Sequence, residues 1–179
     1  GGITTGLGLP LNKIDRLIGI FKAYTTRVGN GPFPTELFDK DGEKLQNIGK
    51  EFGATTGRPR RCGWFDAPLA KYSIMINGFN EITMTKLDIL DEFEEIKVCT
   101  EYECNGEKSK NLSTFINQFD NITPIYTSVP GWKCSTVGIN SFDDLPEKAK
   151  EYICYIEGIL HTPIKHISTG PKRNDMIIR

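Results

Sequence analysis

The clearest periodic pattern of apolar residues lies near the end of the chain. Its members share one helical face: Leu145, Ala149, Tyr152, Ile153, Ile156 and Leu160. Asp143 or Asp144 is suited to cap a helix here, and Pro146 is suited to its first turn. The pattern predicts a helix whose apolar stripe lies on a sheet.

Two further helices are expected in the first half of the chain. One is predicted to begin at Asp66, with Pro68 just inside it, and to end at Asn77-Gly78. Its predicted apolar face consists of Leu69, Tyr72, Met75 and Ile76. A shorter helix is expected around Glu43 to Lys50. Both helices should flank a sheet.

Strand character appears in several segments between the helices. Helical spacing over 14–21 gives way near Gly19 to β-forming residues over 21–28. Segments 82–90 and 96–102 are predicted as strands of one sheet, the second turning at Asn105-Gly106. Segment 163–167 is predicted as a short strand that breaks at Ser168 to Pro171.

Alternating helices and buried strands predict an α/β fold, a layered sheet with flanking helices, although 96–102 could form an antiparallel hairpin. Residues 1–179 show no repeat or linker and are expected to form one unit. The chain opens on Gly1 rather than methionine, and residues 1–10 resemble a glycine-rich loop from the middle of a fold. We therefore expect a piece of a longer protein, with exposed sheet edges that favour aggregation of the piece alone.

Charge and composition narrow the function classes. The 22 basic and 23 acidic residues give a net charge of −1, which disfavours a dedicated nucleic-acid-binding domain. Apolar residues make up 38% and charged residues 25%, as in ordinary soluble proteins. No apolar run is long enough for a membrane span, and the first residues lack signal-peptide character. The expected location is cytoplasmic.

The sulfur and imidazole side chains do not suggest a metal or disulfide framework. The cysteines are odd in number and irregularly spaced, and they are expected to fill core space: Cys62, Cys99, Cys104, Cys134 and Cys154. His161 and His166 offer too few ligands for a zinc site and have no evident nucleophile partner. We expect no metal ligand among these side chains.

The most unusual segment is 53–64, in which three arginines fall within four positions among glycines and threonines. Guanidinium groups grip a carboxylate or phosphate through paired hydrogen bonds, while hydroxyls and glycine amides add donors. The segment predicts an anion-binding loop. The alternative is a solvated basic turn or a crude nucleic-acid patch.

Two strand ends also carry candidate binding residues. At Thr85 to Asp88, the aspartate can accept two N–H donors of a guanine edge, and the stem of Lys86 can lie across a purine. At Ser168 to Pro171, local donors could receive a base carbonyl. Taken alone, each reads equally as a solvated strand end or an ordinary turn. The phosphate-loop, G-x-G-x-x-G and G-x-S-x-G motifs are absent from the sequence.

Five segments, taken in order, resemble the adenylosuccinate synthetase family: Phe33 to Leu37, Glu51 to Asp66, Thr85 to Asp88, Val129 to Trp132 and Ile167 to Pro171. The resemblance covers essentially all 179 residues but matches only the C-terminal portion of a longer family chain. It implies the incomplete C-terminal part of a larger P-loop-NTPase-like α/β fold. The family's phosphate loop, catalytic aspartate and histidine, and magnesium ligands belong to the N-terminal part.

The resemblance implies part of a GTP-dependent ligase that joins IMP and L-aspartate to form adenylosuccinate through a 6-phosphoryl-IMP intermediate. It assigns the aspartate substrate to Ala54, Thr55, Thr56, Gly57, Arg58, Pro59 and Arg60. It places IMP at Arg58 and Val28, and GTP at Arg60, Lys86, Leu87, Asp88, Ser168, Thr169 and Gly170. It also implies Mg²⁺, held mainly by the N-terminal part, and a homodimer. The 179-residue piece alone is expected to be inactive.

Two other functions are compatible with the residues. A stand-alone, non-catalytic guanine-nucleotide-binding module would need the guanine-reading residues without a phosphate loop. An RNA-contacting domain would use Arg58, Arg60 and Arg61 and would bind with a steep dependence on salt. The net charge of −1 makes the RNA reading the weakest.

Overall fold

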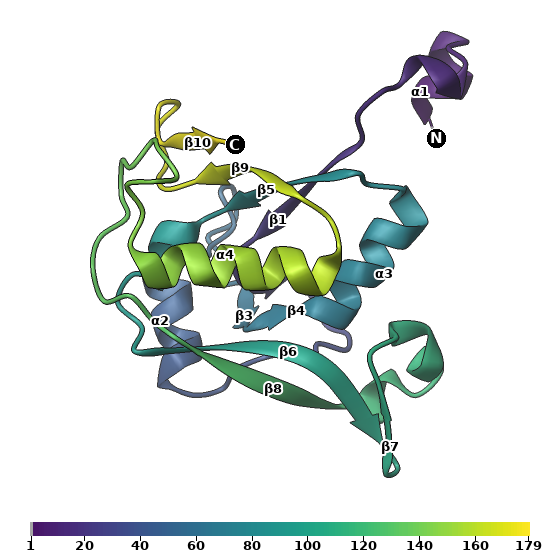
Figure 1. Ribbon diagram of the computed structural model, residues 1–179. Helices are drawn as coiled ribbons and strands as arrows, with labels where there is room; N and C mark the ends of the chain where they lie inside the picture. Colours follow the sequence, from purple (N-terminus) through teal and green to yellow (C-terminus); the bar gives the residue numbers. More distant parts are fainter. Residues whose placement is uncertain (1) are drawn as a thin grey trace.

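The computed structural model describes residues 2–179 and is built around a mixed four-stranded sheet (Figure 1). The strand order is β1-β5-β9-β10, formed by β1 (Ile18–Lys22), β5 (Glu81–Thr85), β9 (Ile164–Ser168) and β10 (Met176–Ile178). The first three strands are parallel, and β10 runs antiparallel to β9. A sheet of this kind places the carboxyl ends of β1, β5 and β9 at one common edge.

A second group of strands lies below this sheet in the view of Figure 1. It contains β4 (Phe65–Asp66), β6 (Glu95–Cys104), β7 (Glu107–Ser109) and β8 (Thr123–Pro130). The long β6 pairs with all three of the others, antiparallel to β7 and β8. A separate ribbon joins β2 (Thr25–Arg27) to β3 (Arg61–Gly63). This ribbon carries the loops that contain the candidate anion-binding residues.

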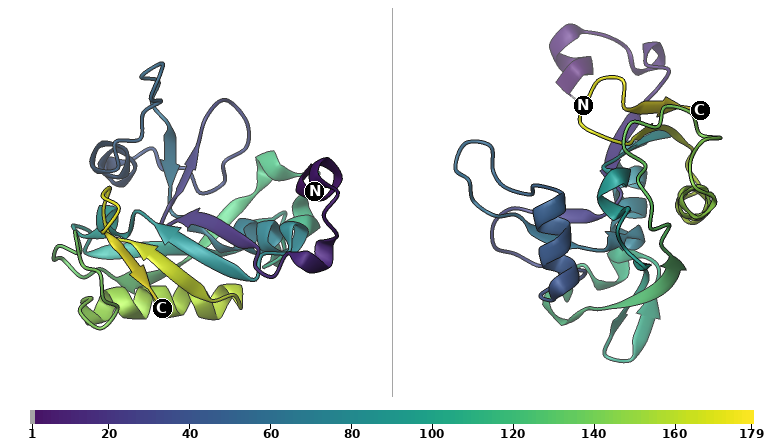
Figure 2. Two further views of the ribbon diagram at one scale, coloured as in Figure 1. Left: turned by 90° about the horizontal axis from the view of Figure 1, so that it is seen from above. Right: turned by 90° about the vertical axis from the view of Figure 1, so that its left-hand side faces the viewer.

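Four α-helices and four short 3₁₀-helices complete the described chain. The α-helices are α1 (Gly2–Leu7), α2 (Lys40–Ile48), α3 (Ala67–Asn77) and α4 (Glu147–Leu160). The 3₁₀-helices are Leu11–Lys13, Leu87–Leu90, Leu112–Phe115 and Phe119–Asn121. Figure 2 shows α4 on one side of the main sheet, with α2 and the loops of the β2–β3 ribbon projecting on the opposite side. Within residues 2–179, no helix is both long and apolar enough to cross a lipid bilayer.

Helix α4 confirms the pattern read near the end of the chain. All of its stripe residues from Ala149 to Leu160 are buried in the main core. The Tyr152 hydroxyl donates to the Ala23 carbonyl at 2.7 Å, which ties the helix to the turn after β1. The cap differs from expectation, because Pro146 itself is the cap residue and no side chain caps the helix.

Helix α3 has the expected ends but the wrong expected face. The Asp66 carboxylate accepts the Leu69 amide at 3.0 Å, and Gly78 ends the helix in the left-handed conformation, with φ of 66°. The buried positions are Ala67, Pro68 and Ala70, whereas Met75 is 66% exposed. The helix contacts β6, α4 and the 3₁₀-helix Leu112–Phe115, and this contact buries the first turn but leaves Met75 and Ile76 exposed.

Several strand predictions were wrong in detail. Residues 14–17 are not helical, and the residues expected to end a helix form β1, because parallel pairing with β5 outweighs their helical spacing. The segment 82–90 is part strand and part 3₁₀-helix, since Lys86 has φ of 62° and ends β5. It also lies in a different sheet from 96–102. A short helix, α1, occupies the opening segment that was expected to be a loop.

The β6–β7 hairpin and β9 agree with the sequence. β6 turns at Asn105-Gly106 into β7, and β9 covers Ile164–Ser168, one residue later at each end than the predicted 163–167. The cysteine prediction holds only in part. Cys62, Cys99 and Cys104 are buried, whereas Cys134 and Cys154 are exposed and therefore do not fill core space.

The outer edge of β1 carries an exposed apolar residue. Ile20 is 76% exposed, and within residues 2–179 β1 pairs with β5 alone in its sheet. Free strand edges of this kind pair with other chains. We expect the 179-residue chain expressed alone to self-associate as its concentration rises, and Ile20→Lys to reduce that association.

Sedimentation velocity over a concentration series measures this prediction. Phe38→Lys is the matched control, because Phe38 is 89% exposed but lies outside every strand. A wild-type chain that stays monomeric throughout the series would contradict the expectation, as would equal effects of the two substitutions.

Candidate functional site

The anion-binding loop is closed by its own backbone. The Gly53 amide donates to the Arg58 carbonyl at 2.8 Å, and the Gly57 amide donates to the Gly53 carbonyl at 2.9 Å. Gly57 has φ of +65°, which a side chain would disfavour at this turn. Residues 54–59 are exposed on a segment that projects from the body of the protein (Figure 2). The loop is thus a compact turn that presents its side chains outward.

Arg58 is the cation of this loop with a free side chain. Its amide donates weakly to the Thr56 hydroxyl at 3.4 Å, but within residues 2–179 its guanidinium forms no hydrogen bond or ion pair. A free guanidinium on a closed loop keeps both arms of its fork for a carboxylate or phosphate. This geometry is compatible with the anion-binding loop predicted from the sequence. That Arg58 binds an anion remains a prediction.

The other two arginines of the loop are tied to the protein. Arg60 donates from Nη1 to the Glu51 carboxylate at 2.8 Å. Arg61 forms a two-armed pair with Glu36 and donates to the Gly29 and Gly31 carbonyls at 3.0 and 2.8 Å. The Arg61 guanidinium is therefore used internally, and the RNA-contacting reading loses one of its three cations.

Val28 lies on the loop that Arg61 holds. It follows β2 and is 64% exposed. Because Arg61 bonds two carbonyls of the same loop, residues 28–31 are fixed beside the start of β3, where the anion-binding loop also ends. Val28 and the anion-binding loop thus adjoin the same β2–β3 ribbon, Val28 after β2 and the loop before β3.

The strand-end residues Lys86, Leu87 and Asp88 follow β5 directly. The Lys86 ammonium donates to the Gly49 carbonyl and lies 3.3 Å from the Glu51 carboxylate. Leu87 is fully buried, so only its backbone could contact a ligand. Asp88 is half-buried and lines an open hollow of about 640 Å³ between the ends of α2 and residues 133–137. A hollow of that size can hold a nucleobase.

Burial raises the pKa of Asp88, and the nearby charges of Asp91 and Asp175 raise it further. The influence of Asp175 matters for the geometry, because this residue belongs to the loop after β9. That loop is held by the Thr169 amide, which donates to the Asp175 carbonyl at 3.0 Å, and β9 contacts the 3₁₀-helix of Asp88. The second strand-end candidate therefore lies beside the first.

The side chains of this second candidate are less available than the sequence suggested. The buried Thr169 hydroxyl donates to the Ile139 carbonyl at 2.7 Å, and the Ser168 hydroxyl donates to the Gly170 carbonyl at 2.9 Å. A side chain at Gly170 would collide with the Asp175 carboxylate. If residues 168–170 contact a nucleobase, they therefore do so chiefly through backbone groups and hydroxyl lone pairs.

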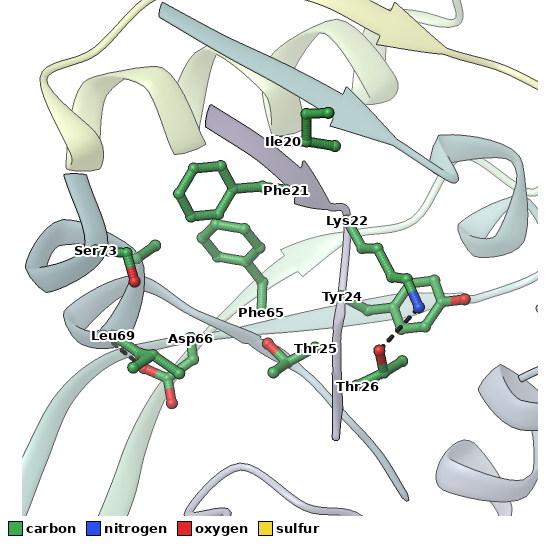
Figure 3. Close-up of a pocket in the computed structure, with 11 residues that line it drawn as sticks. Ile20, Phe21, Lys22, Tyr24, Thr25, Thr26, Phe65, Asp66, Leu69 and Ser73 are labelled. Atoms are coloured by element: carbon green, nitrogen blue, oxygen red, sulfur yellow. Dashed lines mark hydrogen bonds between the residues drawn. The ribbon is translucent and has the colours of Figure 1, made fainter. Parts of the chain in front are cut away.

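Sequence reasoning missed the residues that connect the candidates. Lys22 ends β1 opposite Thr85 and donates to both oxygens of Glu51 at 2.9 Å. It lines a groove of about 230 Å³ beside β1 and α3, and Figure 3 shows its ammonium next to Tyr24 and Thr26. A lysine at the end of a strand was the available signal, but the sequence placed Lys22 near the start of the β-forming segment 21–28 rather than at the end of β1.

The described residues do not form a metal site from side chains alone. Within residues 2–179, no group of three or more His, Cys, Asp or Glu side chains lies at metal-binding distance. The functional geometry thus consists of a free guanidinium on a projecting loop and a half-buried carboxylate at a strand end, with a cluster of cations around one glutamate between them.

Comparison with known proteins gives a consistent result. Residues 1–177 match the family model for adenylosuccinate synthetase. Adenylosuccinate synthetase of Trichlorobacter lovleyi is 50% identical over 178 residues, which is 99% of this chain and 41% of the relative. The Schizosaccharomyces japonicus protein of the same name is 48% identical and is covered to the same 41%. The chain spans about two fifths of the length of these relatives.

Solved structures agree with the sequence matches. A fully ligated adenylosuccinate synthetase from Plasmodium falciparum superposes with a TM-score of 0.91 at 41% identity, over 100% of this chain and 43% of that one. A cyanophage S-2L succinoaminodeoxyadenylate synthetase has a TM-score of 0.52 at 17% identity, which shows a likeness of fold alone. The described α/β layers are thus a partial version of a larger fold.

Proposed function

The chain belongs to the adenylosuccinate synthetase family, and from this we propose that it forms the aspartate- and guanine-binding part of a GTP-dependent ligase joining IMP and L-aspartate. The observation that carries the proposal is the free Arg58 guanidinium on its closed, projecting loop. A planar two-armed donor can hold one carboxylate of a dicarboxylate substrate through two parallel hydrogen bonds.

The reaction needs positioning more than it needs a nucleophile from the protein. The 6-oxygen of a purine is a poor leaving group, so the γ-phosphoryl of GTP is first transferred to it. The amine of L-aspartate then attacks C6 and phosphate leaves, with adenylosuccinate, GDP and phosphate as products. A loop that fixes both the dicarboxylate and the purine nucleotide supplies this positioning.

Each candidate residue has a distinct part in this scheme. Residues 54–60 hold the aspartate carboxylates, with Arg58 also touching IMP and Arg60 also touching GTP. Val28 lies against the IMP ribose. Asp88 accepts the N1–H and the 2-amino group of guanine, with Lys86 and Leu87 at its side and the backbone of residues 168–170 opposite. Each role is supported by exposure or by position at the common strand edge.

The proposed enzyme also uses Mg²⁺, which neutralises phosphate charge during phosphoryl transfer. The described part of this chain has no cluster of three His, Cys, Asp or Glu side chains suited to hold it, so none of its residues is assigned to the ion. A homodimer and a cytoplasmic location complete the proposal and rest on the family resemblance alone.

A direct assay tests the proposal on the complete gene product that contains this sequence. Incubated with IMP, L-aspartate, GTP and Mg²⁺, it is expected to form adenylosuccinate and GDP in equal amounts, measured by liquid chromatography and mass spectrometry. Omission of IMP should abolish both products, and omission of L-aspartate should abolish adenylosuccinate. Binding of GTP without any adenylosuccinate would contradict the ligase and favour the non-catalytic guanine-nucleotide module.

A further inference from the structure

Glu51 is a buried carboxylate surrounded by three cations. It is fully buried, and its two oxygens accept hydrogen bonds from Lys22 at 2.9 Å, from Arg60 at 2.8 Å and from the Tyr24 hydroxyl. Lys86 lies 3.3 Å away. One negative charge therefore lies among three positive charges, and these four side chains together carry a net positive charge.

The partners of Glu51 come from separate parts of the chain. Lys22 ends β1, Lys86 follows β5, and Arg60 closes the anion-binding loop. The Glu51 backbone also takes part, because its carbonyl accepts the Arg60 amide at 2.8 Å. Glu51 thus links one residue of the proposed aspartate loop to one residue of the proposed guanine site.

The carboxylate of Glu51 is ionised throughout the physiological range. Burial alone would raise its pKa, but hydrogen bonds from Tyr24, Lys22 and Arg60 outweigh the burial and bring the pKa to about 2. An ionised, buried group with several partners is held in one position, because moving it would leave a buried charge unpaired.

The cations themselves reach outward from this anchor. The side chains of Arg60 and Lys86 are 32% and 34% exposed, whereas that of Glu51 is 0% exposed. Glu51 takes only Nη1 of Arg60, and within residues 2–179 the other guanidinium nitrogens have no partner. Arg60 is therefore anchored through Nη1, and Lys86 is held by Glu51 together with the Gly49 carbonyl, while both side chains are partly open to a ligand.

We propose that Glu51 is a positioning residue that holds Arg60 and Lys86 at a fixed separation, so that the aspartate loop and the guanine site act as one unit. The inference rests on the proposed ligase function. Without the carboxylate, the two cationic side chains would repel each other and lose their common anchor, and Lys86 would keep only its hydrogen bond to the Gly49 carbonyl.

The test compares two glutamate-to-glutamine variants of the complete gene product. Glu51→Gln keeps the shape of the side chain but removes its charge, and its amide group would point a donor at Arg60 or Lys86. We expect it to raise KM for L-aspartate and KM for GTP together, each by about tenfold or more, which is about 1.4 kcal/mol, with a smaller change in kcat. Glu81→Gln is the matched control, because Glu81 forms a two-armed pair with Arg16 at the amino end of β5, away from the site.

A double-mutant cycle separates positioning from general stability. If Glu51 acts through Arg60, Glu51→Gln should change KM for L-aspartate much less in an Arg60→Ala background than in the wild type. Equal effects in both backgrounds would overturn the inference, as would unchanged KM values in Glu51→Gln. If Glu51→Gln fails to fold, the double-mutant cycle is made with Arg60→Lys and Lys86→Met instead. Strictly additive effects of these two substitutions on KM for GTP would overturn the inference.

Failure of the proposed function gives a different result. A wild-type gene product that makes no adenylosuccinate rejects the ligase and, with it, the two sites that Glu51 would join. An active wild type with an unaltered Glu51→Gln variant rejects only the positioning role.

Discussion

Arg58→Lys is expected to lower kcat/KM for L-aspartate by about 30- to 1000-fold in the complete gene product, although the charge is conserved. The reason is geometric. A guanidinium offers two parallel donors to a carboxylate, whereas an ammonium is a point donor on a flexible stem. A poorly paired substrate carboxylate costs about 2–4 kcal/mol. Because the Arg58 guanidinium has no partner within residues 2–179, its full donor set is available for the substrate.

Steady-state kinetics with L-aspartate as the varied substrate measure this effect. Arg16→Lys is the control. Arg16 holds a carboxylate through two hydrogen bonds, as proposed for Arg58, but that carboxylate is Glu81 at the opposite end of the sheet. This substitution should leave kcat/KM for L-aspartate unchanged. Wild-type kinetics in Arg58→Lys would remove Arg58 from the aspartate site.

The parts of the site that sequence could predict are those encoded by local patterns. The glycines and arginines of 53–61 are typical of a loop, and Ser168 could be assigned to a strand end because the hydrophobic run stops before it. Asp88 was assigned to a strand end as well, although Ile89 and Leu90 follow it and β5 ends at Thr85. The structure places both strand ends at one edge, as parallel pairing of β5 with β9 requires.

The parts that could not be predicted depend on contacts between distant segments. Glu51 meets Lys22, Arg60 and Lys86 only after β1 and β5 pair, and no spacing in the sequence indicates that meeting. In the sequence, Arg61 and Arg58 are equivalent candidates for anion binding. Only the structure shows that Arg61 is paired with Glu36.

Apolar periodicity was also misleading where the fold leaves an apolar surface exposed. Met75 and Ile76 follow the spacing of a buried helix face yet are 66% and 60% exposed. Periodicity reports which residues could be buried together, but burial requires a partner surface. The same limit applies to residues 14–21. Their apolar residues have helical spacing, but residues 18–21 belong to β1, which pairs with β5.

Asp88→Asn is expected to shift nucleotide preference from GTP toward XTP. The ionised carboxylate of Asp88 can accept both the N1–H and the 2-amino group of guanine. An asparagine keeps one acceptor and turns a donor toward the other position, where guanine also has a donor. The mismatch should lower kcat/KM for GTP by about 100-fold, in line with about 3 kcal/mol for a hydrogen bond to a charged group that is lost in a half-buried site.

XTP provides the complementary test of Asp88, because it carries a carbonyl where GTP carries the 2-amino group. The asparagine amide can donate to that carbonyl, so the ratio of kcat/KM for XTP to that for GTP should rise even if overall activity falls.

The pH dependence of GTP binding gives an independent check on the wild type. Since burial raises the pKa of Asp88, protonation should weaken GTP binding at a higher pH than for an exposed aspartate, and Asp88→Asn should remove this pH dependence. An unchanged GTP-to-XTP ratio in Asp88→Asn would show that another group reads the base, and the hollow lined by Asp88 would lose its assignment as the guanine site.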